Sequence, residues 1–205
     1  MKRIVGIMTI LLLCGTGRAT NAQEFSKIEV KPLRVNGNID MLQADPGSGN
    51  IGASVGPDGI LIVDDQFAPL AEKIRAALKN AGGGPLKFIL NTHWHYDHTG
   101  GNKVFGPEAP IIAHTNVRKR LTSDQKIMGQ TIPAEPKEAW PVITFDASLS
   151  VHFNNEEIKV VHFPHGHTDG DSVIFFTTSK VVHMGDHYFA QAFPFVDLEN
   201  GGDVE

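Results

Sequence analysis

The fold is decided by one stretch of the chain, Leu86-Lys87-Phe88-Ile89-Leu90-Asn91-Thr92-His93-Trp94-His95-Tyr96-Asp97-His98. Its apolar start is typical of a buried strand, and it leads to four possible metal ligands within six residues. In an extended segment His93 and His95 point to the same side, so two imidazoles can bind one cation. The turn that follows can aim Asp97 and His98 at a second cation. A strand end that carries such groups predicts an α/β arrangement with a ligand site.

The segments before this stretch read as a β meander and a helix. Four strands are expected at residues 28–34, 39–43, 50–55 and 60–63, with a turn at 57–59. A helix then begins near Pro69 and ends at the three glycines of residues 82–84. Its buried face is expected to contain Leu70, Ile74, Ala77 and Leu78.

The segments after it predict a second β-rich half. A strand at 111–113 and a short helix at 116–121 come first, and the polar stretch 123–141, with its prolines, crosses between the halves. Strands are expected at 142–145, 149–153, 158–163, 172–177 and 180–184. Two β-rich halves suggest a sandwich of two sheets covered by helices, in which the second half stops before reaching its own helix.

Length and composition favour an ordinary globular domain. The chain has 205 residues, 41% of them hydrophobic and 20% charged, with a formal net charge of −5. Without Lys2, Arg3 and Arg18, 15 basic residues stand against 23 acidic ones, a net charge of −8. So acidic a body repels phosphate backbones, which argues against a nucleic-acid partner and for a small-molecule substrate.

Residues 1–22 are predicted to be a secretory signal, with a charged start, an apolar run at 4–14 and a small-residue cleavage site at 20–22. The apolar run is about half the roughly twenty residues that a membrane span needs. We therefore expect a secreted or periplasmic protein, with 23–205 as its domain and no stable membrane anchor. Its single cysteine, Cys14, leaves with the signal, so any metal must be held by His, Asp or Glu.

Three motifs resemble the metal motifs of the metallo-β-lactamase superfamily: the run from His93 to His98, Gly166-His167-Thr168, and Gly185-Asp186. The resemblance extends from about residue 51 to 186. It implies an αββα sandwich with two flanking helical layers and a binuclear zinc site at one edge of the sheets.

The resemblance also implies a role for each matching residue. His93, His95 and His167 would hold the first zinc ion, and Asp97 with His98 the second. Asp186 would bridge both ions, and Asp64 would orient groups of the ligand loop. His187 lies at the rim of the site, and its role is left undecided. The other five histidines are expected to be sheet, loop or surface residues: His114, His152, His162, His165 and His183.

Zinc suits this set of nitrogen and oxygen donors, and a zinc-bound water can have a pKa of about 7. The resulting hydroxide, held also by Asp97, would attack a carbonyl or phosphoryl centre. β-Lactamase activity is one subtype, and lactone, thioester, phosphodiester and sulfate-ester hydrolysis remain open. An oxidoreductase with a non-haem iron site on the same fold is the alternative of another class.

The resembled family places a further histidine on the second ion, well after the Gly-Asp motif. Nineteen residues follow Asp186 here, and His187 is the only histidine among them. We therefore expect a chain truncated at its C-terminal end, with one tight and one weak zinc site. The oligomeric state is left open.

Overall fold

The computed structural model describes residues 25–44, 49–190 and 192–204. The predicted signal, residues 1–22, lies outside these residues. Within them, no helix combines the length and the apolar character needed to cross a membrane.

Seven strands form the first sheet, in the spatial order β1-β2-β3-β4-β5-β6-β9. Their bounds are β1 Val30–Asn36, β2 Ile39–Ala44, β3 Ile51–Gly56, β4 Gly59–Val63, β5 Leu86–Leu90, β6 Ile111–His114 and β9 Ile143–Phe145. Strands β1 to β4 pair with one another in antiparallel fashion, whereas the pairs β4–β5, β5–β6 and β6–β9 are parallel. Parallel strands present their carboxyl ends at one edge, so the histidine run after β5 emerges at the edge where ligands collect.

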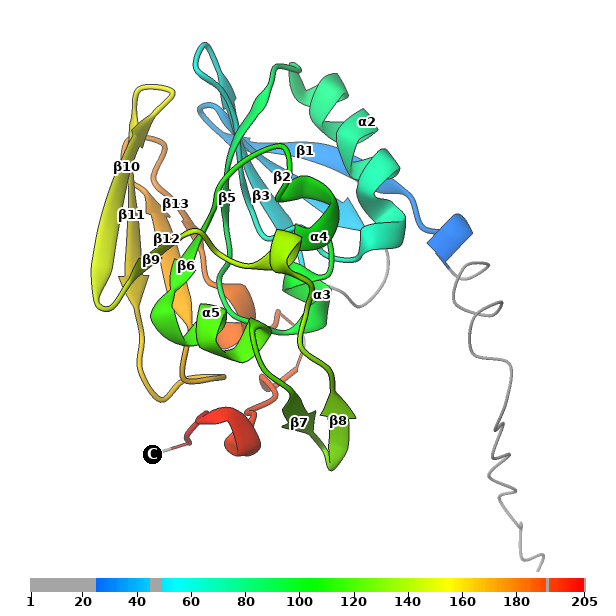
Figure 1. Ribbon diagram of the computed structural model, residues 1–205. Helices are drawn as coiled ribbons and strands as arrows, with labels where there is room; N and C mark the ends of the chain where they lie inside the picture. The colour runs from blue at the N-terminus through cyan, green and yellow to red at the C-terminus, as the bar shows by residue number, and fades with distance from the viewer. Residues whose placement is uncertain (1–24, 45–48, 191, 205) are drawn as a thin grey trace, which may run out of the picture.

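Four antiparallel strands form the second sheet, in the order β10-β11-β12-β13. Their bounds are β10 Ser148–Phe153, β11 Glu156–His162, β12 Ser172–Phe176 and β13 Val181–His183. A separate hairpin pairs β7 Gln125–Ile127 with β8 Gln130–Ile132. Figure 1 shows the two larger sheets facing each other, with this hairpin beside the C-terminal segment.

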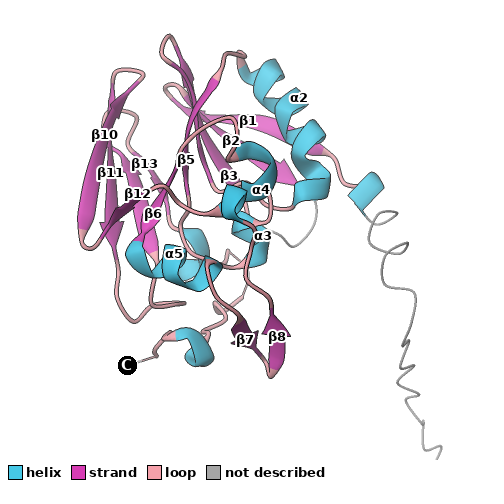
Figure 2. Ribbon diagram, viewed as in Figure 1, coloured by secondary structure: helices cyan, strands magenta, loops and turns pink. Residues whose placement is uncertain are grey.

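The helices are short except for one. The α-helices are α2 Ala71–Ala81, α3 Tyr96–Thr99, α4 Asn102–Phe105 and α5 Thr115–Leu121. The 3-10 helices are η1 Ala68–Leu70, η2 Lys137–Ala139, η3 Gly185–His187 and η4 Leu198–Asn200. Helix α2 covers the outer face of the first sheet, and no α-helix of the described residues covers the outer face of the second (Figure 2).

Strand β4 is buried on both faces, which explains its unbroken apolar sequence. Ile60 and Ile62 pack in the cluster that contains Ile74 of α2. Leu61 and Val63 pack in the cluster between the sheets, with residues such as Phe176 of β12. The two clusters hold β4 and β5 in the middle of the molecule, and this rigid centre positions the loops at their carboxyl ends.

The structure confirms the predicted mixed α/β architecture with two sheets. The expected buried face is also present, with Leu70 in η1 and with Ile74, Ala77 and Leu78 in α2. One prediction was wrong: residues 142–145 were placed in the second half. Strand β9 instead pairs in parallel with β6, with Ile112 opposite Ile143, and so extends the first sheet. The segment 123–141 contains the β7–β8 hairpin and η2, which its polar sequence did not predict.

Candidate metal centre

Three strand ends bring the candidate ligands together. His93, His95 and His98 follow β5, His167 lies in the loop between β11 and β12, and Asp186 lies in η3 directly after β13. The sharp turn after the histidine run depends on glycine, because a Cβ on Gly101 would approach the carbonyl oxygen of Asp65 to 2.5 Å. Local sequence therefore shapes the first ligand loop, and the tertiary fold adds the other two.

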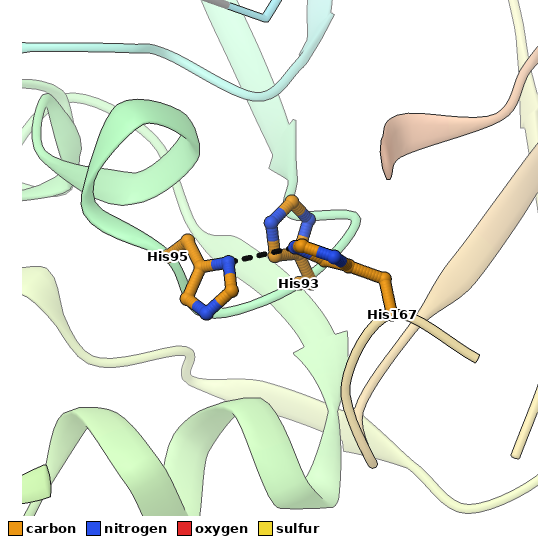
Figure 3. A group of neighbouring side chains, drawn as sticks. All are labelled: His93, His95 and His167. Carbon is orange, nitrogen blue, oxygen red and sulfur yellow. Dashed lines mark hydrogen bonds between the residues drawn. The ribbon is translucent and has the colours of Figure 1, made fainter. Parts of the chain in front are cut away.

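His93, His95 and His167 form the first group of possible ligands. All three are buried, and one nitrogen from each lies within 4.8 Å of the other two. The rings point toward one another, two from the loop after β5 and one from the loop between β11 and β12 (Figure 3). Nδ1 of His95 and Nε2 of His167 are only 2.7 Å apart.

The outer nitrogens of these rings are held by oxygen acceptors. Nε2 of His95 donates to Oδ2 of Asp197 at 2.9 Å, and Nδ1 of His167 donates to the carbonyl oxygen of Phe195. Nδ1 of His93 donates to Oγ1 of Thr92 at 3.0 Å, since that hydroxyl gives its own proton to Asp64. These tautomers follow from the acceptors that face each ring.

The inner nitrogens are consequently left with lone pairs that face a common point. Nε2 of His93 is buried without a hydrogen-bond partner, and the lone pairs of His95 and His167 oppose each other at 2.7 Å. Neutral rings in this arrangement repel unless a proton or a cation lies between them. A tetrahedral cation site formed by three imidazoles has this donor set.

His93, His98 and Asp186 form the second group, again with one atom from each within 4.8 Å. Nδ1 of His98 donates to Oδ2 of Asp64 at 2.7 Å, and the same carboxylate accepts the backbone N–H of Thr92 at 2.8 Å. Nε2 of His98 lies 3.1 Å from Oδ1 of Asp186 without the geometry of a hydrogen bond. Asp64 thus orients both the ligand loop and the His98 ring, the role that the sequence suggested for it.

Asp186, a member of the second group, also faces the first. Its Oδ2 is 3.6 Å from Nε2 of His167, while its Oδ1 faces His98. This is the position expected of a carboxylate that bridges two ions, and bridging itself stays a prediction.

Asp97 lies farther from the other candidate ligands than the sequence predicted. Its Oδ2 is 3.5 Å from Nε2 of His98, its side chain is 37% exposed, and it belongs to neither ligand group found among the described residues. The two groups share His93 instead. Asp97 therefore stands at the open side of the centre, where it can reach an incoming water or substrate.

The remaining histidines lie outside both groups. His187 approaches Oδ2 of Asp171 to 3.5 Å, and His165 is an exposed loop residue with a positive φ of 59°. His114 and His162 stack at 3.7 Å, His183 contacts the carbonyl oxygen of Asn50, and His152 is exposed on β10. None of these histidines belongs to a ligand group, although His187 is close enough to His93 to contribute to the lowering of its pKa.

The surroundings of the centre favour a positive charge on His98 and oppose one on His93 and His95. Burial lowers the pKa of His93 well below its ordinary value and also lowers the pKa of His95, against the carboxylate of Asp197. Burial likewise acts to lower the pKa of His98, but Asp64, Asp186 and Asp97 outweigh it and raise that pKa well above its ordinary value. The neighbouring carboxylates thus stabilise a cation at the second group.

Asp197 is a site residue that the sequence did not reveal. It is 2% exposed, and its Oδ2 accepts from both His95 and Nδ2 of Asn200, the latter at 2.6 Å. Arg120 donates to Oδ1 of Asn200 and makes two hydrogen bonds to Asp169, both at 2.7 Å. Nothing in the local sequence separates Asp197 from the other aspartates, because its partner lies far away in the chain.

Residues 45–204 match the sequence model of the metallo-beta-lactamase superfamily, which covers most of the chain and all the candidate ligands. The chain belongs to the metallo-beta-lactamase superfamily. A hydroxyacylglutathione hydrolase from Pelagibacter ubique is 32% identical over 107 residues, 51% of this chain and 37% of that protein. Another, from Erythrobacter litoralis, is 29% identical over 155 residues, 75% of this chain and 49% of that protein. The matches thus span less than half the length of these two relatives.

Solved structures agree with the superfamily fold. A metallo-beta-lactamase from Cronobacter sakazakii superposes with a TM-score of 0.68 at 16% identity, over 85% of this chain and 68% of that one. A metallo-beta-lactamase from Elizabethkingia meningoseptica gives 0.63 at 24% identity, over 72% and 56%. At these identities the likeness establishes the fold, which confirms the architecture that the sequence motifs implied.

Proposed function

We propose that this superfamily member is a zinc-dependent hydrolase with a binuclear site. The observation that carries the proposal is the orientation of four imidazoles. His93, His95, His98 and His167 each use one nitrogen on an oxygen acceptor and turn the other toward a shared centre. In His93 and His98 the inner nitrogen is buried without any hydrogen-bond partner, and in His95 and His167 the inner nitrogens face each other at 2.7 Å, an arrangement that ordinary buried histidines do not need.

The donor set fits zinc. The residues around the centre offer imidazole nitrogens and carboxylate oxygens, and the body of the chain contains no cysteine. His93, His95 and His167 would hold one ion, and His98, Asp186 and Asp97 the other. Bound zinc lowers the pKa of a coordinated water to about 7 and polarises a carbonyl or phosphoryl oxygen.

The chain's own residues supply orientation and proton handling. Asp97 lines the open side of the centre, where its carboxylate can accept a hydrogen bond from a water and direct that water toward the substrate. Asp64 fixes His98, and Asp197 fixes His95, so the ligands keep one tautomer through the reaction.

Hydrolysis of a bond to a carbonyl carbon is the reaction class that the comparisons support best. The first relatives are named hydroxyacylglutathione hydrolases, and the solved neighbours are named metallo-beta-lactamases. Thioesters, lactones and other esters are therefore the first substrates to examine, with lactams as a named subtype. Phosphodiesters and sulfate esters follow.

Metal analysis and a substrate screen test the proposal. Protein from cells grown without added metal should contain zinc by mass spectrometry and should hydrolyse a member of a panel of thioesters, lactones, esters and lactams. A chelator should abolish that activity, and added zinc should restore it. An EPR-active iron site with no hydrolysis would overturn the proposal in favour of the oxidoreductase alternative.

Export and small-molecule specificity complete the proposal. The charged start and apolar run of residues 1–22 support secretion or delivery to the periplasm, and N-terminal sequencing of the mature protein would test cleavage after Ala22. The net negative charge supports a small-molecule substrate over a nucleic acid.

A further inference from the structure

A large cleft opens onto the second ligand group. It has a volume of 840 Å³, and Asp97, His98 and Asp186 form part of its wall. The rest of the wall comes mainly from β2 and the start of β3 in the first sheet, and from β13 of the second sheet with η3 and the residues just after it. Nε2 of His183 contacts the carbonyl oxygen of Asn50 at 3.0 Å and so joins the two sides.

The wall of this cleft is mainly apolar. On β2, alternation turns Leu42 into the cluster under α2, whereas Ile39, Met41 and Gln43 face the other way, toward the cleft. Asp40 and Ala44 also border the cleft. Phe176, Val181 and Met184 contribute from the opposite side. A substrate chain lying here would contact hydrocarbon over most of its length.

No lysine or arginine is among the cleft-lining residues that the structure describes. The neighbouring sequence positions 45–48 and 191 contain none either. Two cations of β1 lie opposite cleft-lining residues of β2. Lys31, opposite Gln43, forms an ion pair with Glu29 at 2.5 Å. Arg34, opposite Asp40, donates from Nε to that carboxylate at 2.9 Å and from Nη1 to the carbonyl oxygen of Gly37 at 2.7 Å. Among the described residues, the wall of the cleft therefore contains no lysine or arginine for a distant substrate carboxylate, and the two neighbouring cations already pair with acidic side chains.

We propose that this cleft selects uncharged substrates with an apolar acyl chain and rejects those that carry a carboxylate remote from the bond to be cleaved. The inference rests on the proposed hydrolase function and names its substrate class. A carboxylate moved from water against this apolar wall would lose hydration without gaining a partner. A methylene in the same place gains by leaving water.

A matched pair of esters tests the proposal with the zinc-loaded protein. p-Nitrophenyl hexanoate and the mono-p-nitrophenyl ester of adipic acid have the same chain length and differ by a terminal carboxylate. We expect kcat/KM to be about tenfold or more higher for the hexanoate, the effect of an uncompensated charge. From p-nitrophenyl acetate to p-nitrophenyl hexanoate, kcat/KM should rise by up to about fourfold for each methylene buried.

A charge placed in the cleft should relax this selectivity. Gln43→Lys adds a cation to an exposed position of the wall and should raise kcat/KM for the adipate ester by about threefold, with the hexanoate unchanged. Gln130→Lys makes the same change on exposed β8, outside the cleft, and should alter neither value. Equal responses of both variants would contradict the proposal.

Binding separates failure of the cleft from failure of the hydrolase function. Hexananilide and adipic monoanilide replace the ester by a stable amide, and ligand-observed NMR measures their binding to zinc-loaded and zinc-stripped protein. If the zinc-stripped protein prefers hexananilide and the zinc-loaded protein hydrolyses no ester, the proposed selectivity of the cleft is supported and the proposed hydrolase function is refuted. If esters are hydrolysed and the adipate ester is used equally well or better, the proposed selectivity is refuted and the hydrolase function stands. Equal binding of both anilides without zinc would also overturn the cleft proposal.

Discussion

Nε2 of His95 and Oδ2 of Asp197 lie 2.9 Å apart, although 102 residues separate them along the chain. The contact fixes which nitrogen of His95 faces the metal centre, because the N–H is used on the carboxylate. The backbone reinforces it, since the N–H of Asp197 donates to the carbonyl oxygen of His167 at 2.9 Å. One C-terminal segment thus orients two candidate ligands from different loops.

Asp197→Asn should weaken zinc binding by about 10- to 100-fold, the usual effect of losing the carboxylate behind a histidine ligand. Competition with a coloured chelator measures this affinity without relying on turnover. Glu199→Gln, an exposed change in the same 3-10 helix, is the control and should leave zinc affinity unchanged. If Asp197→Asn folds normally and binds zinc like the wild type, Asp197 has no orienting role.

His95→Ala should lose at least one zinc equivalent and most of the activity, a fall of about 100-fold or more, because it removes one of three imidazoles from the first group. Zinc content by mass spectrometry and ester turnover measure the two effects. His152→Ala on the exposed face of β10 serves as the control. Full metal content with unchanged turnover in His95→Ala would refute the assignment.

Asp97→Asn should reduce kcat by about 100-fold while the first ion stays bound. The amide has nearly the same shape, but it carries no charge and takes no proton from a water at the open side of the centre. Turnover and zinc content, measured on the same sample, separate this effect from loss of the ion. Wild-type turnover in Asp97→Asn would show that Asp97 is not catalytic.

Local patterns predicted much of the fold, and distant contacts account for most of the rest. The strands that flank the histidine run have clear apolar periodicity, and the run itself lies within one loop, so neither needed tertiary information. Strand β9 was misplaced because its short sequence fits either sheet, and its pairing with β6 is decided by the fold. Asp197 was missed for the same reason, since its contact with His95 spans 102 residues, more than half of the domain. The sharing of His93 between both ligand groups likewise depends on where Asp186 arrives.

Zinc titration should reveal one tight and one weak site. His93 belongs to both ligand groups found in the described residues, and a single imidazole nitrogen binds one ion at a time. When the first ion takes His93, the second retains His98 and Asp186 with the more exposed Asp97. Calorimetric titration of zinc-stripped protein measures both affinities. Two equally tight sites, with His187 shown by NMR to bind metal, would contradict this expectation.

Outside the two ligand groups, His114, which stacks on His162, should make stability depend on pH. Burial, and then the neighbouring His162, lower the pKa of His114 below its ordinary value, and Nδ1 of His114 accepts the N–H of Asn116 at the start of α5. A lowered folded-state pKa means that the unfolded chain binds the proton more readily. This contribution is therefore present above the ordinary histidine pKa of about 6.5 and is lost as pH falls through the folded value, at about 1.4 kcal/mol for each unit of difference.

His114→Asn keeps a capping oxygen without a titrating ring, so its melting temperature should fall less than that of the wild type between pH 7.5 and pH 5. His152→Asn, which changes an exposed histidine, should follow the wild-type curve. A His114→Asn curve parallel to the wild type would show that this histidine does not contribute to the pH dependence.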